Sequence, residues 1–315
     1  MAKEVDEIIR EEETTDAYEI EGWTGFNFPG RGDKYSDFKW HWYHFTGTDY
    51  DNKTGKTTVF KIMGDGKDWS SGVDGENGNY DYLMFANLDF DHPEVVKEME
   101  KWGVWVSREL DLDGMRLDAI KHINDEFIKK FLAAGRKELG EDFYAVGEYW
   151  KQDLDSLDEY LKEVRYKVDL FDVPLHYNMY QASEHGRDYD LTKILDGTLV
   201  QNHPTLAVTF VDNHDSQWGS SLQSAVKDWF KPSAYALILL MKDGYPCIFY
   251  GDYYGVSGNP PVHRGIIDNL LEIRKNHAYG EQKYYFAHPN TIGFTRVGGG
   301  QHPKSGVAGL IYDGD

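Results

Sequence analysis

Three short stretches of this 315-residue sequence each end an apolar run on acidic side chains. The first, LDLDGMRLDAIKHI, carries Arg116 and Asp118 two residues apart. Side chains alternate between the two faces of a strand, so this pair points to the same side. The second stretch, AVGEYW, places Glu148 after its apolar run, and the third, TFVDNHD, ends at Asp215.

Carboxyl groups at the carboxyl ends of neighbouring parallel strands are typical of an α/β-barrel active site. The competing interpretation is structural, with each acid paired to an arginine or to a helix N-terminus. Three such stretches in one chain favour the active site, although Asp113 and Asp212 are interpreted as structural acids.

The elements that must position these acids begin after residue 91, where helical and strand patterns alternate. Such alternation predicts parallel strands with right-handed crossovers. About five strands are expected, whereas a closed barrel of this kind needs eight. The predicted fold class is therefore α/β, a partial (β/α)8 (TIM) barrel with about five βα units. Helices are expected at 93–110, 125–139, 154–164, 232–241 and 266–273, and strands at 115–117, 143–146, 168–173, 206–211 and 247–250.

The two ends of the chain differ from this pattern. Residues 1–91 contain a short acidic helical pattern at 5–13 and strand patterns at 56–63 and 80–85. We therefore expect a β-rich inserted domain at 1–91, the barrel part at 92–279, and the start of a C-terminal β domain at 280–315.

Composition excludes several classes of function. The net charge of −21, from 33 basic and 54 acidic residues, disfavours nucleic acid and anionic membranes as partners. No apolar run is long enough to span a membrane, and no secretory signal is found, which leaves the localisation open. The single cysteine, Cys247, cannot form an intramolecular disulfide and is expected to be buried in a strand.

The three acidic stretches resemble the signature regions of the α-amylase family of glycoside hydrolases. The flanking segments GRGDKYSDFKWHWYHF at 30–45 and ENGNYDYLMFANLDFDHP at 76–93 are similar to the bacterial liquefying α-amylases. The resemblance implies retaining endohydrolysis of α-1,4-glucosidic bonds in starch and maltooligosaccharides. The family's first signature region, a strand ending in an Asp and an Asn-His pair, is absent, so the resemblance also implies a member shortened at both ends.

The resemblance assigns a role to each site residue. Asp118 would be the nucleophile, Glu148 the general acid/base, and Asp215 the group that binds the distorted sugar. Arg116 would hold Asp118 ionised and oriented. Further substrate contacts are implied for Lys121, His122, His214, Trp150 and Tyr80. A solvated or supporting role for Lys121 and His122, and a core role for Tyr80, remain alternatives.

The resemblance also implies calcium, which takes six to eight oxygen ligands. In the resembled enzymes an aspartate usually stands where Thr46 and Asn87 stand here, so we expect a weakened calcium site or loss of an accompanying sodium. The alternative is an acidic, solvated loop without a metal. The spacing of His41 and His44 suggests a metal, but without further ligands they are interpreted as packing residues. The implied calcium ligands are Asp68, Asp81, Asn87, Asp89, Asp91 and the carbonyl of His122.

Two other functions stay open at this point. One is a catalytically inactive α-glucan-binding fragment, and the other is a related transglycosylase. A partial barrel also exposes an unpaired strand edge. Self-association could cover that edge, the fragment could be unstable, or the front segment could fold differently from the family.

Overall fold

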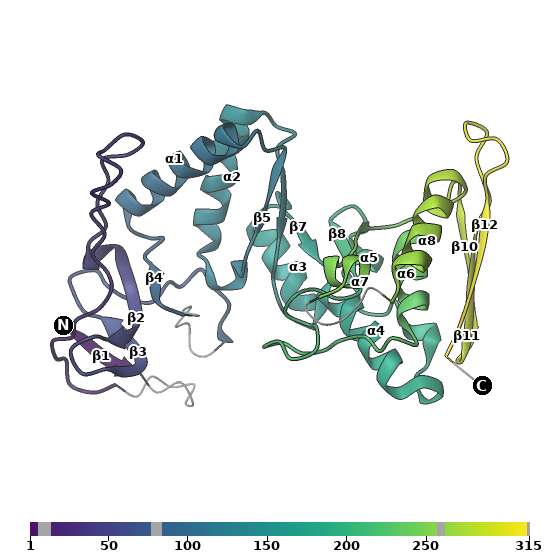
Figure 1. Ribbon diagram of the computed structural model, residues 1–315, viewed down its shortest axis with the longest axis horizontal. Helices are drawn as coiled ribbons and strands as arrows, with labels where there is room; N and C mark the ends of the chain where they lie inside the picture. Colours follow the sequence, from purple (N-terminus) through teal and green to yellow (C-terminus); the bar gives the residue numbers. More distant parts are fainter. Residues whose placement is uncertain (6–13, 77–83, 257–261, 314–315) are drawn as a thin grey trace. The chain divides into compact units, whose positions relative to one another are not determined.

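The structure is a computed structural model that describes residues 1–5, 14–76, 84–256 and 262–313 (Figure 1). The chain forms two compact units, and each is described by itself. The first comprises residues 1–148 and 162–167, and the second comprises 149–161 and 168–315. The predicted domain limits at 91 and 279 remain a prediction.

The first unit begins with an antiparallel sheet of strand order β1-β3-β2-β4. Its core is apolar, with Phe45, Val59 and Phe60 buried between the strands and the loops that cover them. The strand pattern predicted at 56–63 is confirmed, whereas 6–13 and 77–83 lie outside the described residues. The strands are β1 (Ala2–Val5), β2 (Phe45–Asp51), β3 (Lys56–Ile62) and β4 (Ala86–Leu88).

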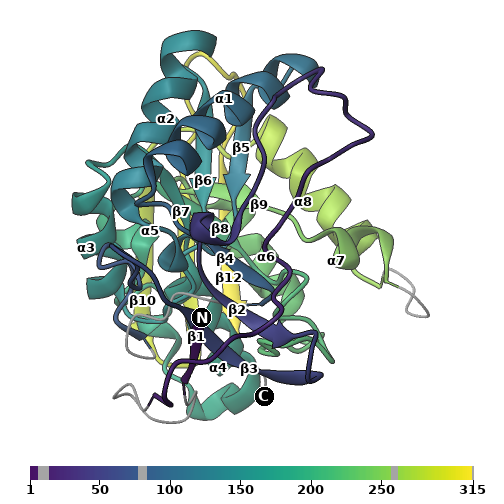
Figure 2. The same ribbon diagram turned by 90° about the vertical axis from the view of Figure 1, so that its left-hand side faces the viewer.

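Two long helices, each followed by a parallel strand, come next in the same unit (Figure 2). Proline opens the first helix, and the side chain of Asn124 caps the second by accepting from the Phe127 amide at 2.9 Å. The two helices pack closely at Gly103, where a Cβ would stand 2.4 Å from the Phe131 ring. The elements are α1 (Pro93–Glu109), β5 (Gly114–Leu117), α2 (Asp125–Leu139) and β6 (Tyr144–Gly147).

The second unit contains three parallel strands, with β7 paired to β8 and β8 to β9. The helix α6 is buried on most sides, as its continuous apolar sequence predicts. The elements are β7 (Asp169–Phe171), α4 (Val173–His185), α5 (Leu199–Asn202), β8 (Ala207–Phe210), α6 (Lys231–Leu240), β9 (Tyr245–Cys247), α7 (Tyr250–Tyr254) and α8 (Arg264–Asn276), with α3 (Leu154–Glu163) leading into them.

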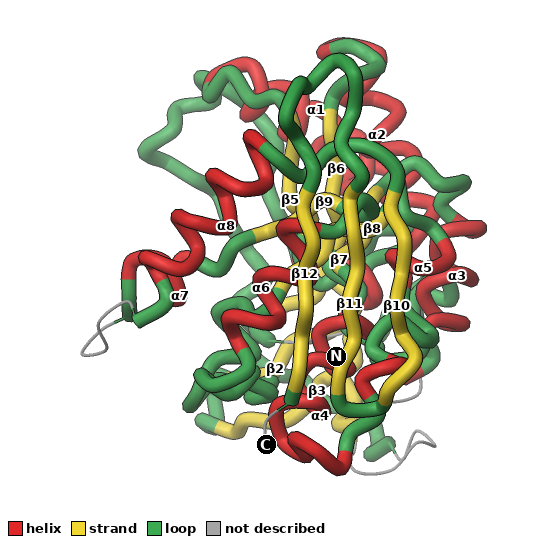
Figure 3. Tube along the Cα trace, turned by 90° about the vertical axis from the view of Figure 1, so that its right-hand side faces the viewer, coloured by secondary structure: helices red, strands yellow, loops and turns green. Residues whose placement is uncertain are grey.

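The second unit ends in an antiparallel sheet of order β10-β11-β12, which Figure 3 shows as three long neighbouring strands. Ile292, Phe294 and Ile311 form its buried side. The β-like pattern predicted beyond residue 280 is therefore confirmed as a sheet. Its strands are β10 (Gln282–His288), β11 (Thr291–Arg296) and β12 (Val307–Tyr312).

The parallel strands follow the order β5-β6-β7-β8-β9, so the described chain contains the five βα strands that the sequence predicts. Two expectations were wrong. The last strand lies at Tyr245–Cys247 rather than 247–250, and Cys247 is exposed rather than buried. The reason is that β9 ends the strand order and has a partner on one side only within the described residues. No helix that the structure describes is long and apolar enough to cross a membrane.

Candidate active site

The first unit brings Arg116, Asp118 and Glu148 together at the carboxyl ends of β5 and β6. In the parallel register Leu117 faces Gly147, so the next residue of each strand is an acid. The Arg116 guanidinium connects them, since Nη1 donates to the Asp118 carboxylate and Nη2 donates to Glu148 Oε2 at 2.9 Å. The predicted pair of carboxyl groups therefore shares one cation.

The two carboxyl groups differ in their surroundings. The Glu148 side chain is 8% exposed, whereas that of Asp118 is 70% exposed. Burial raises the pKa of Glu148 above its ordinary value, and the neighbouring Asp118 charge adds to the rise, against the opposing effects of the Ala119 amide and Arg116. A raised pKa suits a proton donor, and an accessible carboxylate suits a nucleophile.

Ala119 is a residue of the candidate site that the sequence did not indicate. Its backbone is left-handed, with φ of 47°, a conformation that costs energy for a residue with a Cβ. This turn directs the Ala119 amide towards Glu148 Oε2, to which it donates at 3.2 Å. Such strain is common beside functional groups, but no local pattern in the sequence signals it.

The residues that follow are less available to a ligand than predicted. Lys121 and His122 lie in a short 3₁₀ turn, Ile120–His122. The Lys121 ammonium pairs with Glu76 Oε2 at 2.7 Å and its side chain is only 13% exposed, which favours the supporting role. His122 is half-buried, and Tyr80 lies outside the described residues.

His214 and Asp215 lie in the second unit, on the loop after β8. His214 Nε2 stands 3.1 Å from Asp215 Oδ2, and the His214 side chain is largely exposed. The Asp215 amide donates to Asn213 Oδ1 at 2.9 Å, which fixes the turn. Trp150 contacts the rings of His176 and Phe210, so at least part of its surface serves the core rather than a ligand.

Asp212 has the structural environment expected of it. It is buried beneath the same loop, where it accepts from Ser216 Oγ at 3.2 Å and faces the Lys231 ammonium at 2.9 Å. Lys231 also binds Asp252, which in turn accepts from the Tyr235 hydroxyl at 2.6 Å. Burial raises the pKa of Asp212 to about 6. This cluster connects the loop after β8 to α6 through Asp212 and Lys231.

Among the described residues, the side chain of each predicted calcium ligand from Asp68 to Asp91 is bonded to another side chain of the protein. Asp68 pairs with Lys61 at 2.8 Å, and Asp89 pairs with the buried Lys67. Asn87 donates to Thr46 at 2.7 Å, so these two neutral side chains bond to each other. Asp91 accepts from Asn124 at 3.0 Å, and Asp81 lies outside the described residues. The described carboxylates of this set are thus engaged by donors of the chain itself.

A second candidate metal group contains His44, His92 and Glu94, whose ligand atoms lie within 4.8 Å of one another. His44 Nδ1 accepts from the His41 amide at 3.0 Å, so its proton lies on Nε2 and is donated to Glu94 at 3.1 Å. Burial also lowers the pKa of His44, which favours the neutral ring. The hydrogen bonds therefore account for this group without a metal.

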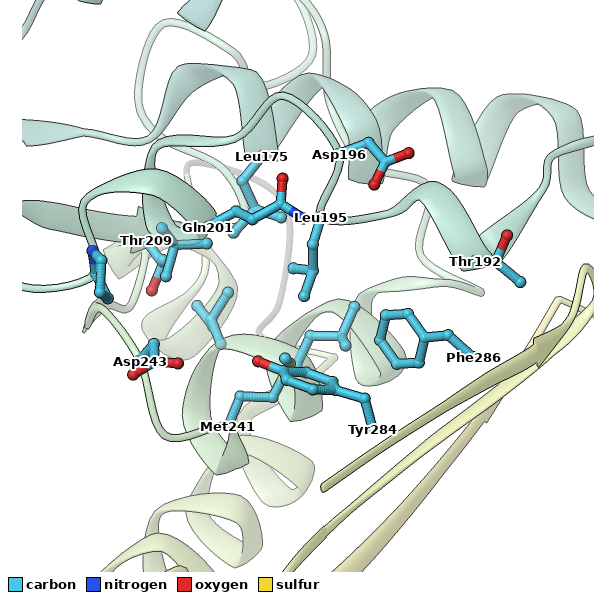
Figure 4. Close-up of a pocket in the computed structure, with 14 residues that line it drawn as sticks. Leu175, Thr192, Leu195, Asp196, Gln201, Thr209, Met241, Asp243, Tyr284 and Phe286 are labelled. Atoms are coloured by element: carbon cyan, nitrogen blue, oxygen red, sulfur yellow. The ribbon is translucent and has the colours of Figure 1, made fainter. Parts of the chain in front are cut away.

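A cavity of about 410 Å³ lies in the second unit (Figure 4). Its wall includes Thr209 of β8, Met241 at the end of α6, and Tyr284 and Phe286 of β10. None of the predicted site residues that the structure describes lines it. It is therefore not where the predicted chemistry would occur.

Comparison with known proteins supports the resemblance. The model of the alpha amylase catalytic domain matches residues 31–288. A glucan 1,4-alpha-maltohexaosidase of Bacillus sp. (strain 707) is 50% identical over 99% of this chain and 61% of its own length. An alpha-amylase of Bacillus licheniformis is 48% identical over 99% of this chain and 62% of its own length. The chain thus spans less than two thirds of these relatives.

Solved structures support the fold alone. An alpha-amylase from Geobacillus thermoleovorans, complexed with acarbose, aligns with a TM-score of 0.53 at 23% identity, over 70% of this chain and 54% of its own. The cyclomaltodextrin glucanotransferase CldA aligns with a TM-score of 0.56 at 24% identity, over 74% of this chain and 51% of its own. Both relationships agree with an incomplete (β/α) barrel carrying additional antiparallel sheets.

Proposed function

The chain belongs to the alpha-amylase catalytic-domain family, and we propose that it hydrolyses internal α-1,4-glucosidic bonds of starch and maltooligosaccharides with retention. The observation that carries this proposal is the sharing of the Arg116 guanidinium by Asp118 and Glu148. Retaining hydrolysis requires a carboxyl separation of roughly 5 Å, and one guanidinium bonded to both groups is an arrangement suited to holding them close.

In the proposed reaction Asp118 attacks the anomeric carbon while Glu148 donates its proton to the leaving oxygen. The resulting glycosyl ester is then hydrolysed by water, which Glu148, now ionised, deprotonates. Burial of Glu148 supports the first step because it favours the protonated carboxyl group. Arg116 orients both groups through its planar fork, which a lysine could not replace.

Asp215 and His214 are proposed to bind hydroxyl groups of the sugar at the cleavage point. Their support is the mutual contact at 3.1 Å on a loop whose backbone is fixed from within. Lys121 and His122 are proposed to act at the edge of the site, and Trp150 to offer a ring surface. Calcium and sodium take no part in the proposed steps.

Hydrolysis of a blocked maltoheptaoside tests the proposal directly. Wild type should release the reporter and give products of α configuration by NMR, whereas Glu148→Gln should lose the activity. Glu141→Gln, an exposed acid just before β6, is the matched control and should retain it. A folded wild-type chain that binds maltooligosaccharide without turnover would instead indicate a glucan-binding protein. Transfer to a second sugar, rather than to water, would indicate a transglycosylase.

A further inference from the structure

A buried ammonium group is bonded to Asp89, one of the calcium ligands that the resemblance implies. Lys67 follows β3, and its side chain is only 6% exposed. Its Nζ donates to the carbonyl oxygen of Tyr43 and to Oδ2 of Asp89, the residue after β4. One backbone carbonyl and one carboxylate are also the kinds of oxygen that calcium selects.

The nearly buried Asp89 carboxylate has its counter-charge in Lys67. Its side chain is 11% exposed, and its other oxygen, Oδ1, accepts from the Asp91 amide at 3.1 Å. Because a buried carboxylate without a counter-charge is strongly unfavourable, Lys67 provides the neutralisation that a metal would otherwise supply. A calcium ion competing for Asp89 Oδ2 would have to displace Lys67 from it.

The neighbouring positions reduce the need for calcium further. Thr46 and Asn87 stand where the resemblance implies aspartates, and they satisfy each other through a hydrogen bond of 2.7 Å. Asp68 is largely exposed and paired with Lys61, so it needs no metal either. In a set of aspartates, repulsion would have to be relieved by bound cations, whereas here the chain relieves it with its own side chains.

We propose that the Lys67 ammonium is the built-in cation of this region and that the chain folds without calcium. The proposal does not rest on the proposed hydrolysis, because a catalytically inactive chain with this sequence would carry the same Lys67 contacts. It corrects the expectation of a weakened calcium site to one of replacement.

The first test compares the melting temperature of the full 315-residue chain in EDTA and in millimolar calcium chloride. A calcium site of micromolar affinity would raise Tm by roughly 5 °C under saturation. We expect the two melting temperatures to agree within about 1 °C, because Lys67 already neutralises Asp89 and the described carboxylates nearby are paired within the chain. A Tm that falls in EDTA and is restored by calcium, but not by magnesium, would overturn the proposal.

The second test removes the ammonium. Lys67→Met should lower Tm by roughly 5 °C or more, because it leaves Asp89 buried and unpaired. Lys61→Met is the matched control, since its partner Asp68 is exposed, and its Tm should stay close to that of wild type. Calcium should stabilise Lys67→Met in a saturable way and leave Lys61→Met unchanged.

A double variant keeps the second test decisive if Lys67→Met fails to fold. Lys67→Met with Asp89→Asn removes both charges, so Tm should recover towards wild type and not respond to calcium. A double variant as unstable as Lys67→Met would show that Lys67 acts only by packing, and the proposal would fail. A Lys67→Met chain as stable as wild type would overturn it equally.

Discussion

The acids that follow the parallel strands differ between the two units in their exposure and in their bonding partners. In the first unit Asp118 and Glu148 are held by a side chain, Arg116, which is 35% exposed. In the second unit Asp172 and Asp212 are fully enclosed. Asp172 accepts from the amides of residues 175, 199 and 200 at 3.0, 3.1 and 2.7 Å. Asp118 remains open to a ligand, whereas Asp172 and Asp212 are enclosed by groups of their own chain.

The contrast teaches how to separate a catalytic acid from a structural one. Both kinds follow an apolar strand, so sequence position alone does not distinguish them. What differs is the exposure of the carboxylate. Backbone amides at helix N-termini occupy the acceptor sites of the buried Asp172, and Ser216 and Lys231 occupy those of the buried Asp212. The exposed Asp118 keeps lone pairs free for a substrate. Asp172 is thus the structural alternative that the sequence analysis considered for the whole set.

The largest effect should come from breaking the buried cluster of the second unit. Lys231→Met leaves Asp212 and Asp252 without their shared cation and should lower the free energy of unfolding by about 3–5 kcal/mol. Lys227→Met is the matched control. Lys227 Nζ lies 3.1 Å from Glu184 Oε2, and both side chains are partly exposed, so the free energy of unfolding should fall by about 1 kcal/mol or less. Urea denaturation measures both. Equal losses would contradict the contrast between buried and exposed pairing.

Glu148 should produce a pH-dependent effect in the first unit. Its folded pKa is raised from the ordinary 4.5, so its contribution to stability is complete below that pH and is lost as pH rises through the folded pKa. Wild type should therefore lose stability relative to Glu148→Gln between acidic and neutral pH. Urea denaturation of both proteins across this range measures the difference, and a difference independent of pH would refute the raised pKa.

Much of the fold could be predicted because its signals are local. Asn124 and Gly140 mark the two ends of α2, and Pro93 opens α1, as expected. The helix α4 was missed because it is buried on several faces, so its apolar residues lack a single stripe. A periodic spacing of apolar residues indicates a helix that is buried on one face only. A helix buried on several faces does not show this spacing.

The site could be predicted only in part for a related reason. The identities of Asp118 and Glu148 follow from short motifs, but their surroundings depend on contacts between distant residues. Lys67 and Asp89 are 22 positions apart and belong to no shared motif. The Ala119 conformation is likewise imposed by the surrounding structure rather than by a local preference. Long-range pairing therefore decides whether an acid binds a metal, a substrate or its own chain.

Arg116 should have a small effect on stability and a larger one on activity. Because its side chain is partly exposed, Arg116→Met should change the free energy of unfolding by less than about 1 kcal/mol. Loss of the guanidinium should nevertheless reduce maltoheptaoside hydrolysis about a hundredfold, since the two carboxyl groups lose their common alignment. Urea denaturation and turnover, measured on one preparation, separate the two effects. A stability loss as large as that of Lys231→Met would show that the two units pair their acids in the same way.

The smallest effect concerns Cys247 at the end of β9. Cys247→Ser should alter the free energy of unfolding by less than about 0.5 kcal/mol, because the side chain is exposed. The thiol also reports on the strand edge beside it. A strand such as β9, with a partner on one side only within the described residues, offers backbone groups to another chain. Maleimide labelling should then slow as protein concentration rises, in parallel with the mass measured by light scattering. Labelling at a constant rate over a concentration range in which the mass increases would place the contact elsewhere, at β5 or on a sheet face.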